Sequence, residues 1–378
     1  MDQPILQFGT SRFLQAHVDL FVSEALASGA SGQALGGITV VQTTDNPASA
    51  QRVAALASGD GYPVRIRGLL HGERVDNTVT CCAVREALQA TADWPRLLAL
   101  IAGGVQVIIS NTADRGYQLD AQDDAGLIEH ADQIPRSFPA KLLVLLYHRW
   151  RIVPKAPLSL FPCELIERNG DTLHDLVAGL AQEWALPTDF VGWLREHCVW
   201  ANSLVDRIVS DALHPVGAVA EPYALWAIEQ QERLVLPCLH HDIVLTDDLE
   251  RYERLKLFLL NAGHTYLAER WLRDGRAADE TVVQAMNDPA LRAELEALWQ
   301  DEIVPVFKKL GQRLEALAYL VDLRERLLNP YLAHRLADIA QNHAQKKQRR
   351  FGPVLALTSE LGLDLPQPRM HAALASQD

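Results

Sequence analysis

The segment Pro4-Ile-Leu-Gln-Phe-Gly9-Thr10-Ser11-Arg12-Phe13 opens the chain and decides the fold. Residues 4–9 favour a short buried strand that ends at Gly9, and residues 13–27 carry apolar side chains at nearly helical spacing. A strand, a glycine turn and a helix in this order are typical of the first βα unit of a nucleotide-binding domain. The segment therefore predicts a phosphate turn formed by Gly9, Thr10, Ser11 and Phe13.

One position of this turn departs from the usual dinucleotide pattern. That pattern has glycine in its second slot, so that the backbone approaches the pyrophosphate, and this chain has Ser11 there. A tight strand–helix turn that holds no ligand explains the segment about as well.

Two further strands are expected over residues 37–41 and 105–110. Ligands of open α/β sheets bind at the carboxyl ends of the strands. Asn111 and Thr112, which follow the later strand, are therefore candidate cofactor contacts. Asp45 follows the earlier strand and is the candidate partner of the adenosine ribose, a role that favours NAD. The alternative for Asp45 is a cap at the start of the next helix.

The remaining pattern continues the alternation and then changes. It predicts helices over 47–57, 93–102, 140–149 and 172–185 and a strand over 157–163. From about residue 248 to 350 the chain is almost entirely helical in pattern. From residue 353 onward, Pro353, Pro366 and Pro368 favour a loosely docked coil. We expect an α/β protein, with a Rossmann-type dinucleotide-binding domain over residues 1–247 and a mostly α-helical domain over 248–378.

Composition narrows the function classes. The chain has 378 residues, of which 48% are hydrophobic, and its 48 acidic and 35 basic residues give a net charge of -13. Such a chain has ample apolar surface to fold, and its acidity disfavours nucleic-acid binding. It has no apolar run long enough for a membrane span, no basic region at its start, and five cysteines, an odd number that fits reduced thiols. We expect a cytoplasmic protein; its oligomeric state is left open.

The candidate catalytic residues lie in the segment Lys256-Leu-Phe-Leu-Leu-Asn261-Ala-Gly-His264. At about 100° per residue, Asn261 lies about 140° and His264 about 80° around a helix from Lys256, so the three share one broad arc. A lysine on an otherwise apolar helix is costly unless it is neutral or paired, and desolvated lysines serve as general bases. A snorkelling lysine beside a core asparagine and histidine is the other interpretation.

The spacing Lys-x4-Asn-x2-His resembles the signature of the polyol-specific long-chain dehydrogenase/reductase family, the mannitol dehydrogenase family. Other segments resemble motifs of that family in the same order along the chain. They are Phe8 to His17, Phe161 to Asp171, Asn202 to Arg207, Ala285 to Asp288 and Arg326 to His334. Several motifs in one order are far more specific than any one of them.

The resemblance implies a zinc-independent oxidoreductase that transfers a hydride between NAD and a secondary alcohol carbon. It implies Lys256 as the general base or acid, Asn169 and Asn261 as donors to the substrate oxygen, and His264 as a substrate contact. Asp206 helps to shape the pocket in this interpretation, or else pairs with Arg207. Arg326 is the candidate for the sugar chain or a substrate carboxylate, with a surface ion pair to Asp322 as the alternative.

Within the family, Pro162-Cys-Glu-Leu-Ile166 and Glu183-Trp-Ala-Leu-Pro187 look most like the hexuronate reductases of the tagaturonate/altronate type. The expected partner is therefore a small-molecule sugar acid, with a neutral polyol such as mannitol or arabinitol as the alternative. A nucleotide-binding regulatory protein without turnover is the alternative from another class.

No metal is expected. The one tight cluster of metal-ligand residue types is His240-His241-Asp242, whose spacing is too short for two imidazoles to share one site on a helix face. A loop that enters a strand is the expected structure there.

Overall fold

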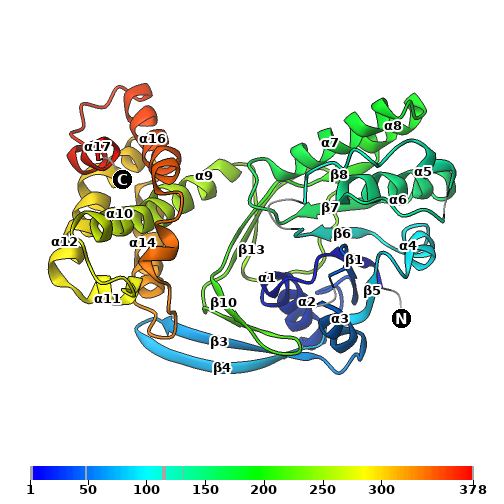
Figure 1. The fold of residues 1–378 in the computed structure, drawn as a ribbon, viewed down its shortest axis with the longest axis horizontal. Coiled ribbons are helices and arrows are strands. Elements are labelled where there is room, and N and C mark those ends of the chain that lie inside the picture. The colour runs from blue at the N-terminus through cyan, green and yellow to red at the C-terminus, as the bar shows by residue number, and fades with distance from the viewer. Residues whose placement is uncertain (1–2, 47–48, 113–115, 131, 377–378) are drawn as a thin grey trace. The chain divides into compact units, whose positions relative to one another are not determined.

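The computed structural model describes residues 3–46, 49–112, 116–130 and 132–376 (Figure 1). The chain forms two compact units. The N-terminal unit comprises Met1–Arg65, Thr78–Ala220 and Ala224–Leu249, and the C-terminal unit comprises Ile66–Asn77, Glu221–Tyr223 and Glu250–Asp378. Two short segments, 66–77 and 221–223, thus group with the C-terminal helices. The predicted domains, 1–247 and 248–378, divide the chain at one point and therefore place these two segments in the N-terminal domain.

The N-terminal unit is built on a six-stranded parallel sheet. Its strand order is β5-β2-β1-β6-β7-β8. The strands are β1 (Ile5–Phe8), β2 (Ile38–Gln42), β5 (Val84–Gln89), β6 (Val107–Ser110), β7 (Leu158–Pro162) and β8 (Cys198–Trp200). This is the strand order of a dinucleotide-binding α/β sheet, so the predicted fold class is confirmed for this unit.

Helices connect these parallel strands. They are α1 (Arg12–Gln15), α2 (Val18–Ala27), α3 (Ala50–Ala57), α4 (Trp94–Ile101), α5 (Gly126–Glu129), α6 (Phe138–Ile152), α7 (Asn169–Glu183) and α8 (Thr188–Glu196). Apolar residues of α4, α6, α7 and α8 join those of β1, β6 and β7 in one buried core. This core fixes the carboxyl edge of the sheet, where the turn after β1 lies.

Two smaller sheets complete the strand inventory. One has the order β10-β11-β3-β4 and the other β13-β12-β9. Their strands are β3 (Tyr62–Leu70), β4 (Glu73–Cys81), β9 (Ser203–Asp206), β10 (Val209–Ala212), β11 (Ala218–Ala220), β12 (Leu225–Glu229) and β13 (Ile243–Thr246).

The C-terminal unit is mostly helical, as expected. It contains α10 (Ala262–Arg273), α11 (Val282–Asn287), α12 (Pro289–Ala297), α13 (Val304–Lys309), α14 (Arg313–Leu327), α15 (Leu336–Ile339), α16 (His343–Glu360) and α17 (Pro368–Ala375). A helix α9 (Leu249–Arg254) leads into it, and two stretches are π-helical, η2 (Leu255–Asn261) and η3 (Leu298–Ile303). Among the described residues, no helix is long and apolar enough to cross a membrane.

The predicted coil after residue 353 is wrong. Helix α16 continues to Glu360 with Pro353 inside it, and α17 follows. Val354 and Met370 are fully buried in the core of the C-terminal unit, and Pro368 stands in the first turn of α17, where no N–H is needed. Burial of these apolar side chains therefore outweighs the cost of a proline within a helix.

The predicted continuous helix over 13–27 is interrupted. Helix α1 ends at Gln15, and α2 begins at Val18 after His17, whose φ of -126° and ψ of -93° are not helical. The carbonyl oxygen of Ala16 accepts a hydrogen bond from Nη1 of Arg207 at 2.6 Å. A side-chain donor that is distant in sequence thus bonds the carbonyl at the break.

Candidate active site

The turn after β1 requires the glycine that begins it. Gly9 has φ +117°, and a Cβ placed on it would lie 2.5 Å from the carbonyl oxygen of Asn111. The positive φ of Gly9 and the close approach of Asn111, which directly follows β6, both exclude a side chain. Dinucleotide-binding sheets have a tight, closely packed turn of this kind after the first strand, so the turn at Gly9 fits a dinucleotide cofactor.

Ser11 uses its hydroxyl to close the turn. Its Oγ accepts a hydrogen bond from the backbone N–H of Leu14 and donates to Oδ1 of Asn111, each at 3.3 Å. Ser11 is thereby the N-cap of α1. The structure thus brings Gly9, Ser11 and Asn111 together, although Asn111 is distant in sequence. Phe13, half-buried in α1, lies against the ring of His17.

Glu164 organises the carboxyl edge between β6 and β7. Its buried carboxylate accepts hydrogen bonds from the N–H and Oγ1 of Thr112, at 2.9 and 3.0 Å, and from Oγ of Ser110 at 3.0 Å. The hydroxyl of Tyr117 is 3.4 Å away, and burial beside this carboxylate raises the pKa of Tyr117 well above its usual range. This role of Glu164 was not predicted, although its place directly after a buried strand was the available indication.

Asn169 differs from its expected role. Its Nδ2 donates to the backbone carbonyls of Pro162, Glu164 and Ser203, and its Oδ1 accepts the N–H of Ser203 at 3.0 Å. The side chain is buried, with 1% exposed. The amide therefore joins the chain after β7 to the start of β9, and these bonds occupy the donors expected to face a substrate oxygen.

Asp45 and Asp206 take different positions in the N-terminal unit. Asp45 is exposed beyond the end of β2. The helix start that Asp45 was predicted to cap includes residues 47–48, which lie outside the described residues, so the cap stays a prediction. The ribose role of Asp45 also stays a prediction. Asp206 is buried at the end of β9, and the guanidinium of Arg207 beside it donates to Ala16.

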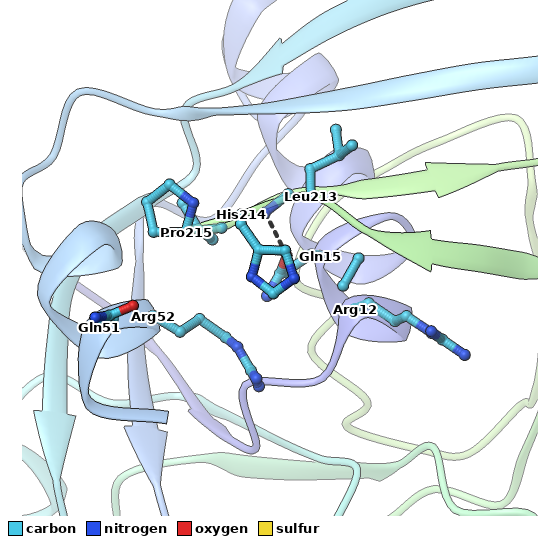
Figure 2. Close-up of a pocket in the computed structure, with 10 residues that line it drawn as sticks. Arg12, Gln15, Gln51, Arg52, Leu213, His214 and Pro215 are labelled. Carbon is cyan, nitrogen blue, oxygen red and sulfur yellow. Dashed lines mark hydrogen bonds between the residues drawn. The ribbon is translucent and has the colours of Figure 1, made fainter. Parts of the chain in front are cut away.

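Beside the turn lies a cavity of about 250 Å³ (Figure 2). It is lined from α1, α3 and the loop between β10 and β11, all within the N-terminal unit. Nη1 of Arg52, on α3, donates to the carbonyl oxygen and the hydroxyl of Thr10 at 3.1 and 3.2 Å. Thr10 is thus held by a residue that the sequence analysis did not single out.

Lys256, Asn261 and His264 share one continuous helical stretch in the C-terminal unit. Lys256 and Asn261 lie in the π-helix η2 and are half-buried, and His264 lies in α10 with 8% exposed. The N–H of Ala262 bonds the carbonyl of Leu257, five residues earlier. The helical-wheel angle expected between Lys256 and Asn261 is therefore wrong, because a π-helix brings residues five apart close to one another. His264 then follows three residues later on the same side.

The π-helix leaves carbonyl groups that distant side chains bond. Nη1 of Arg350 donates to the carbonyl of Asn261 at 3.2 Å and to Oγ1 of Thr265 at 2.7 Å. Nε1 of Trp299, in η3, donates to the carbonyl of Leu259 at 3.1 Å. These two bonds explain how the irregular helix is held at the candidate catalytic residues.

The ring of His264 lies edge-on to His334, with centroids 5.0 Å apart and an interplanar angle of 74°. Burial lowers the pKa of His334 below its usual value, which favours the neutral ring at neutral pH.

Arg326 is not on the surface. It is 4% exposed and pairs with Glu221, while Tyr223 stacks on its guanidinium with 4.2 Å between the guanidinium carbon and the ring centroid. The predicted surface location is therefore wrong, although burial raises the pKa of Asp322 and the charge of Arg326 acts against that rise. The guanidinium of Arg326, which was expected to bind the substrate, is thus already paired with the carboxylate of Glu221.

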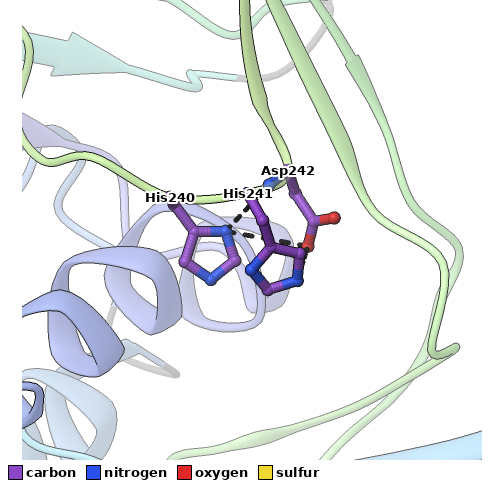
Figure 3. A group of neighbouring side chains, drawn as sticks. All are labelled: His240, His241 and Asp242. Carbon is purple, nitrogen blue, oxygen red and sulfur yellow. Dashed lines mark hydrogen bonds and ion pairs between the residues drawn. The ribbon is translucent and has the colours of Figure 1, made fainter.

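The cluster His240-His241-Asp242 brings its candidate ligand atoms within 4.8 Å of one another (Figure 3). Nε2 of His240 donates to Glu24 at 2.7 Å, and Nδ1 of His240 accepts the N–H of Asp242 at 3.2 Å. Both ring nitrogens of His240 are therefore in use, which leaves two of the three groups as ligands. A structural metal site needs about four, so we assign none here.

Comparison with known proteins gives one family for the whole chain. The family model for the mannitol dehydrogenase Rossmann domain matches residues 3–236, and that for the mannitol dehydrogenase C-terminal domain matches residues 248–376.

Similar curated proteins include the altronate oxidoreductase of Klebsiella pneumoniae (strain 342), which is 34% identical over 98% of this chain and 78% of its own length. The altronate oxidoreductase of Bacillus subtilis (strain 168) is 31% identical over 97% of this chain and 77% of its own length.

Similar solved structures share the fold at low sequence identity. A substrate-free D-sorbitol dehydrogenase has a TM-score of 0.81 at 19% identity, and covers 99% of this chain and 80% of its own. The mannitol 2-dehydrogenase of Pseudomonas fluorescens, solved with NAD and D-mannitol, has a TM-score of 0.75 at 18% identity, and covers 99% and 79%.

Proposed function

The chain belongs to the mannitol dehydrogenase family, and from this premise we propose that it is an NAD-dependent reductase of the tagaturonate/altronate type. It is an oxidoreductase that acts on a secondary alcohol of a polyol or sugar acid. In the proposed reaction a keto-hexuronate is reduced to an aldonate, or the aldonate is oxidised. The finer substrate class is supported by the altronate oxidoreductases, whose similarity runs through both family domains.

One structural observation carries the proposed chemistry. The π-helix brings Lys256 and Asn261 close together, and His264 follows on the same side. An oxygen that gains negative charge needs a proton donor and hydrogen-bond donors around it. We assign the ammonium of Lys256 as the acid in ketone reduction and its neutral amine as the base in alcohol oxidation. The amide of Asn261 stabilises the oxygen, and the imidazole of His264 orients the substrate.

The N-terminal unit supplies the dinucleotide site in this proposal. Gly9 gives the phosphate room, while Asn111 and Thr112 hold the neighbouring edge of the sheet. NAD(H), when bound, supplies or accepts the hydride. The chemistry left to the protein is orientation and proton transfer, and no metal is part of the proposal.

A neutral polyol is the second candidate substrate, and one observation favours it. Glu221 occupies the guanidinium of Arg326, so the residue expected to bind a uronate carboxylate is already paired. A neutral substrate needs no such partner.

The test follows the loss of NADH absorbance at neutral pH with tagaturonate, fructuronate and fructose. We expect turnover with a keto-uronate and not with fructose. Turnover of fructose alone would move the protein to the polyol branch. Binding of NADH without turnover of these ketoses, or of a wider panel of polyols with NAD, would favour the regulatory alternative.

A further inference from the structure

The cavity beside the phosphate turn gathers positive charge. Figure 2 shows the guanidinium of Arg52 and the imidazole of His214 facing the same hollow, while Arg12 stands at its wall and extends outward. No carboxylate is among the described residues that line the cavity, and the ion pairs among described residues include neither Arg12 nor Arg52. In a chain with a net charge of -13, this local excess favours an anionic ligand.

The walls of this cavity are held in place. Gln15 is 3% exposed; its Nε2 donates to the carbonyl of Thr10 at 3.1 Å, and its Oε1 accepts the N–H of Gly217 at 3.0 Å. Gly217 has φ +129°, and a Cβ placed there would lie 2.4 Å from the carbonyl oxygen of Pro63. One buried side chain thus ties the phosphate turn to the loop that carries His214. A ligand would meet a largely preformed site.

Arg52 retains donors for such a ligand. Both of its bonds to Thr10 come from Nη1, and Nε and Nη2 take no part in them. A guanidinium presents these donors in a fork that matches two oxygens of a phosphate. The cavity volume of about 250 Å³ holds a phosphate group and is below the usual range for a whole cofactor.

The place of the cavity indicates which phosphate it takes. Helix α3 follows β2 along the chain, and this part of the fold meets the adenosine ribose. An acidic residue there accepts hydrogen bonds from the 2′-hydroxyl, whereas a nearby arginine accommodates a 2′-phosphate. The described residues of the lining include two arginines and no acid.

We propose that the cavity of Arg12, Arg52 and His214 binds the 2′-phosphate of NADP(H), so that the enzyme accepts NADP(H) beside NAD(H). This inference rests on the proposed function in one respect: the proposed reaction and the proposed phosphate site both require that the protein binds a dinucleotide. Arg52 forms the charged hydrogen bonds, His214 adds a donor from the opposite loop, and Arg12 adds positive charge at the wall.

Binding tests the site without any sugar. In calorimetric titrations of the full chain, 2′,5′-ADP should bind about tenfold or more tightly than 5′-AMP, as expected for a charge-assisted pair. Arg52→Gln should remove that difference, and Arg52→Lys should keep part of it. Arg195→Gln, at an arginine with 76% of its side chain exposed on α8, is the matched control and should change neither affinity.

Equal binding of the two nucleotides by the unaltered protein would overturn the proposal. So would an equal loss of both affinities in Arg52→Gln, because that pattern assigns the arginine to the phosphates that NAD shares. The kinetic counterpart compares kcat/KM for NADPH and NADH in the same variants, with a selective loss for NADPH expected. Selective 2′,5′-ADP binding with no sugar turnover would refute the proposed function and leave the phosphate site standing.

Discussion

Arg326 and Glu221 form a buried bidentate ion pair in the C-terminal unit. Nη2 of Arg326 lies 2.9 Å from Oε1 of Glu221, and Nε donates to both carboxylate oxygens at 3.1 Å. Tyr319 adds its hydroxyl at 3.3 Å from Nη1. The pair fastens helix α14 to the short segment 221–223, which belongs to the same unit.

Glu221→Gln should destabilise the protein by about 3–5 kcal/mol, because it leaves a buried guanidinium without its counter-charge. Urea unfolding measures this. The control is Asp338→Asn, which breaks the exposed pair of Arg335 and Asp338 and should cost less than about 1 kcal/mol. An unchanged midpoint in Glu221→Gln would mean that the pair does not hold the segment.

Gly263→Ala should disturb the helix that carries the candidate catalytic residues. The new Cβ would lie 2.9 Å from Cζ2 of Trp299, whose indole bonds the carbonyl of Leu259. Overpacking of this kind costs about 1–3 kcal/mol, and we expect kcat to fall with stability. Gly179→Ala, in α7 with nothing within 4 Å, should instead be neutral or slightly stabilising. Equal thermal midpoints for the two variants would contradict this packing argument.

Lys256→Ala should lower kcat about 10²–10⁴-fold, the range for loss of a positioned acid or base. NADH oxidation with the best ketose of the panel measures it, and thermal unfolding confirms that the variant is folded. Lys308→Ala, at an exposed lysine of α13, is the control and should keep full activity. Wild-type rates in Lys256→Ala would remove this residue from its role.

Met370→Ala should destabilise the protein by about 2–5 kcal/mol, as for a fully buried methionine. A loosely docked tail would show almost no change. The comparison variant is Arg349→Ala, at an exposed position of α16, where we expect a small effect. Chemical denaturation of both variants therefore distinguishes a C-terminal segment that is packed in the core from one that is loosely docked.

Asp19 should make stability depend on pH. Burial raises the pKa of Asp19 to about 7, and the hydroxyl of Tyr62 donates to it at 2.7 Å. The folded state therefore holds a proton that the unfolded chain has released above its ordinary pKa of 3.8. Stability from this group is present at low pH and is lost as the pH rises from about 4 to 7.

Asp19→Asn removes that loss, since the amide carries no charge. Relative to the unaltered protein, its stability should increase by about 2 kcal/mol between pH 5 and pH 7, at about 1.36 kcal/mol for each pKa unit. Thermal or urea unfolding at both pH values measures it. A difference between variant and parent that does not change with pH would refute the raised pKa.

Local patterns carried much of the architecture. The strand before Gly9, the alternation of helices and strands, and the helical run after residue 248 follow from hydrophobic spacing and turn residues near each other in the chain. Lys256, Asn261 and His264 were predicted as candidate catalytic residues in the same way, because their spacing is local. The prolines from residue 353 onward led to the wrong prediction of a coil, because a helix-breaking residue does not reveal how much apolar surface its neighbours bury in a distant core.

What the sequence by itself determined about this protein is therefore its order of elements and the chemistry of its short motifs. Only the tertiary structure decided which partners those residues have. The side-chain amide of Asn169 donates to backbone carbonyls. Arg326 donates to the carboxylate of Glu221, which is 105 positions away in the sequence, and Arg350 donates to the carbonyl of Asn261, which is 89 positions away. The reason is physical: hydrogen bonds and ion pairs act over a few ångströms in space, and separation along the chain does not encode that distance.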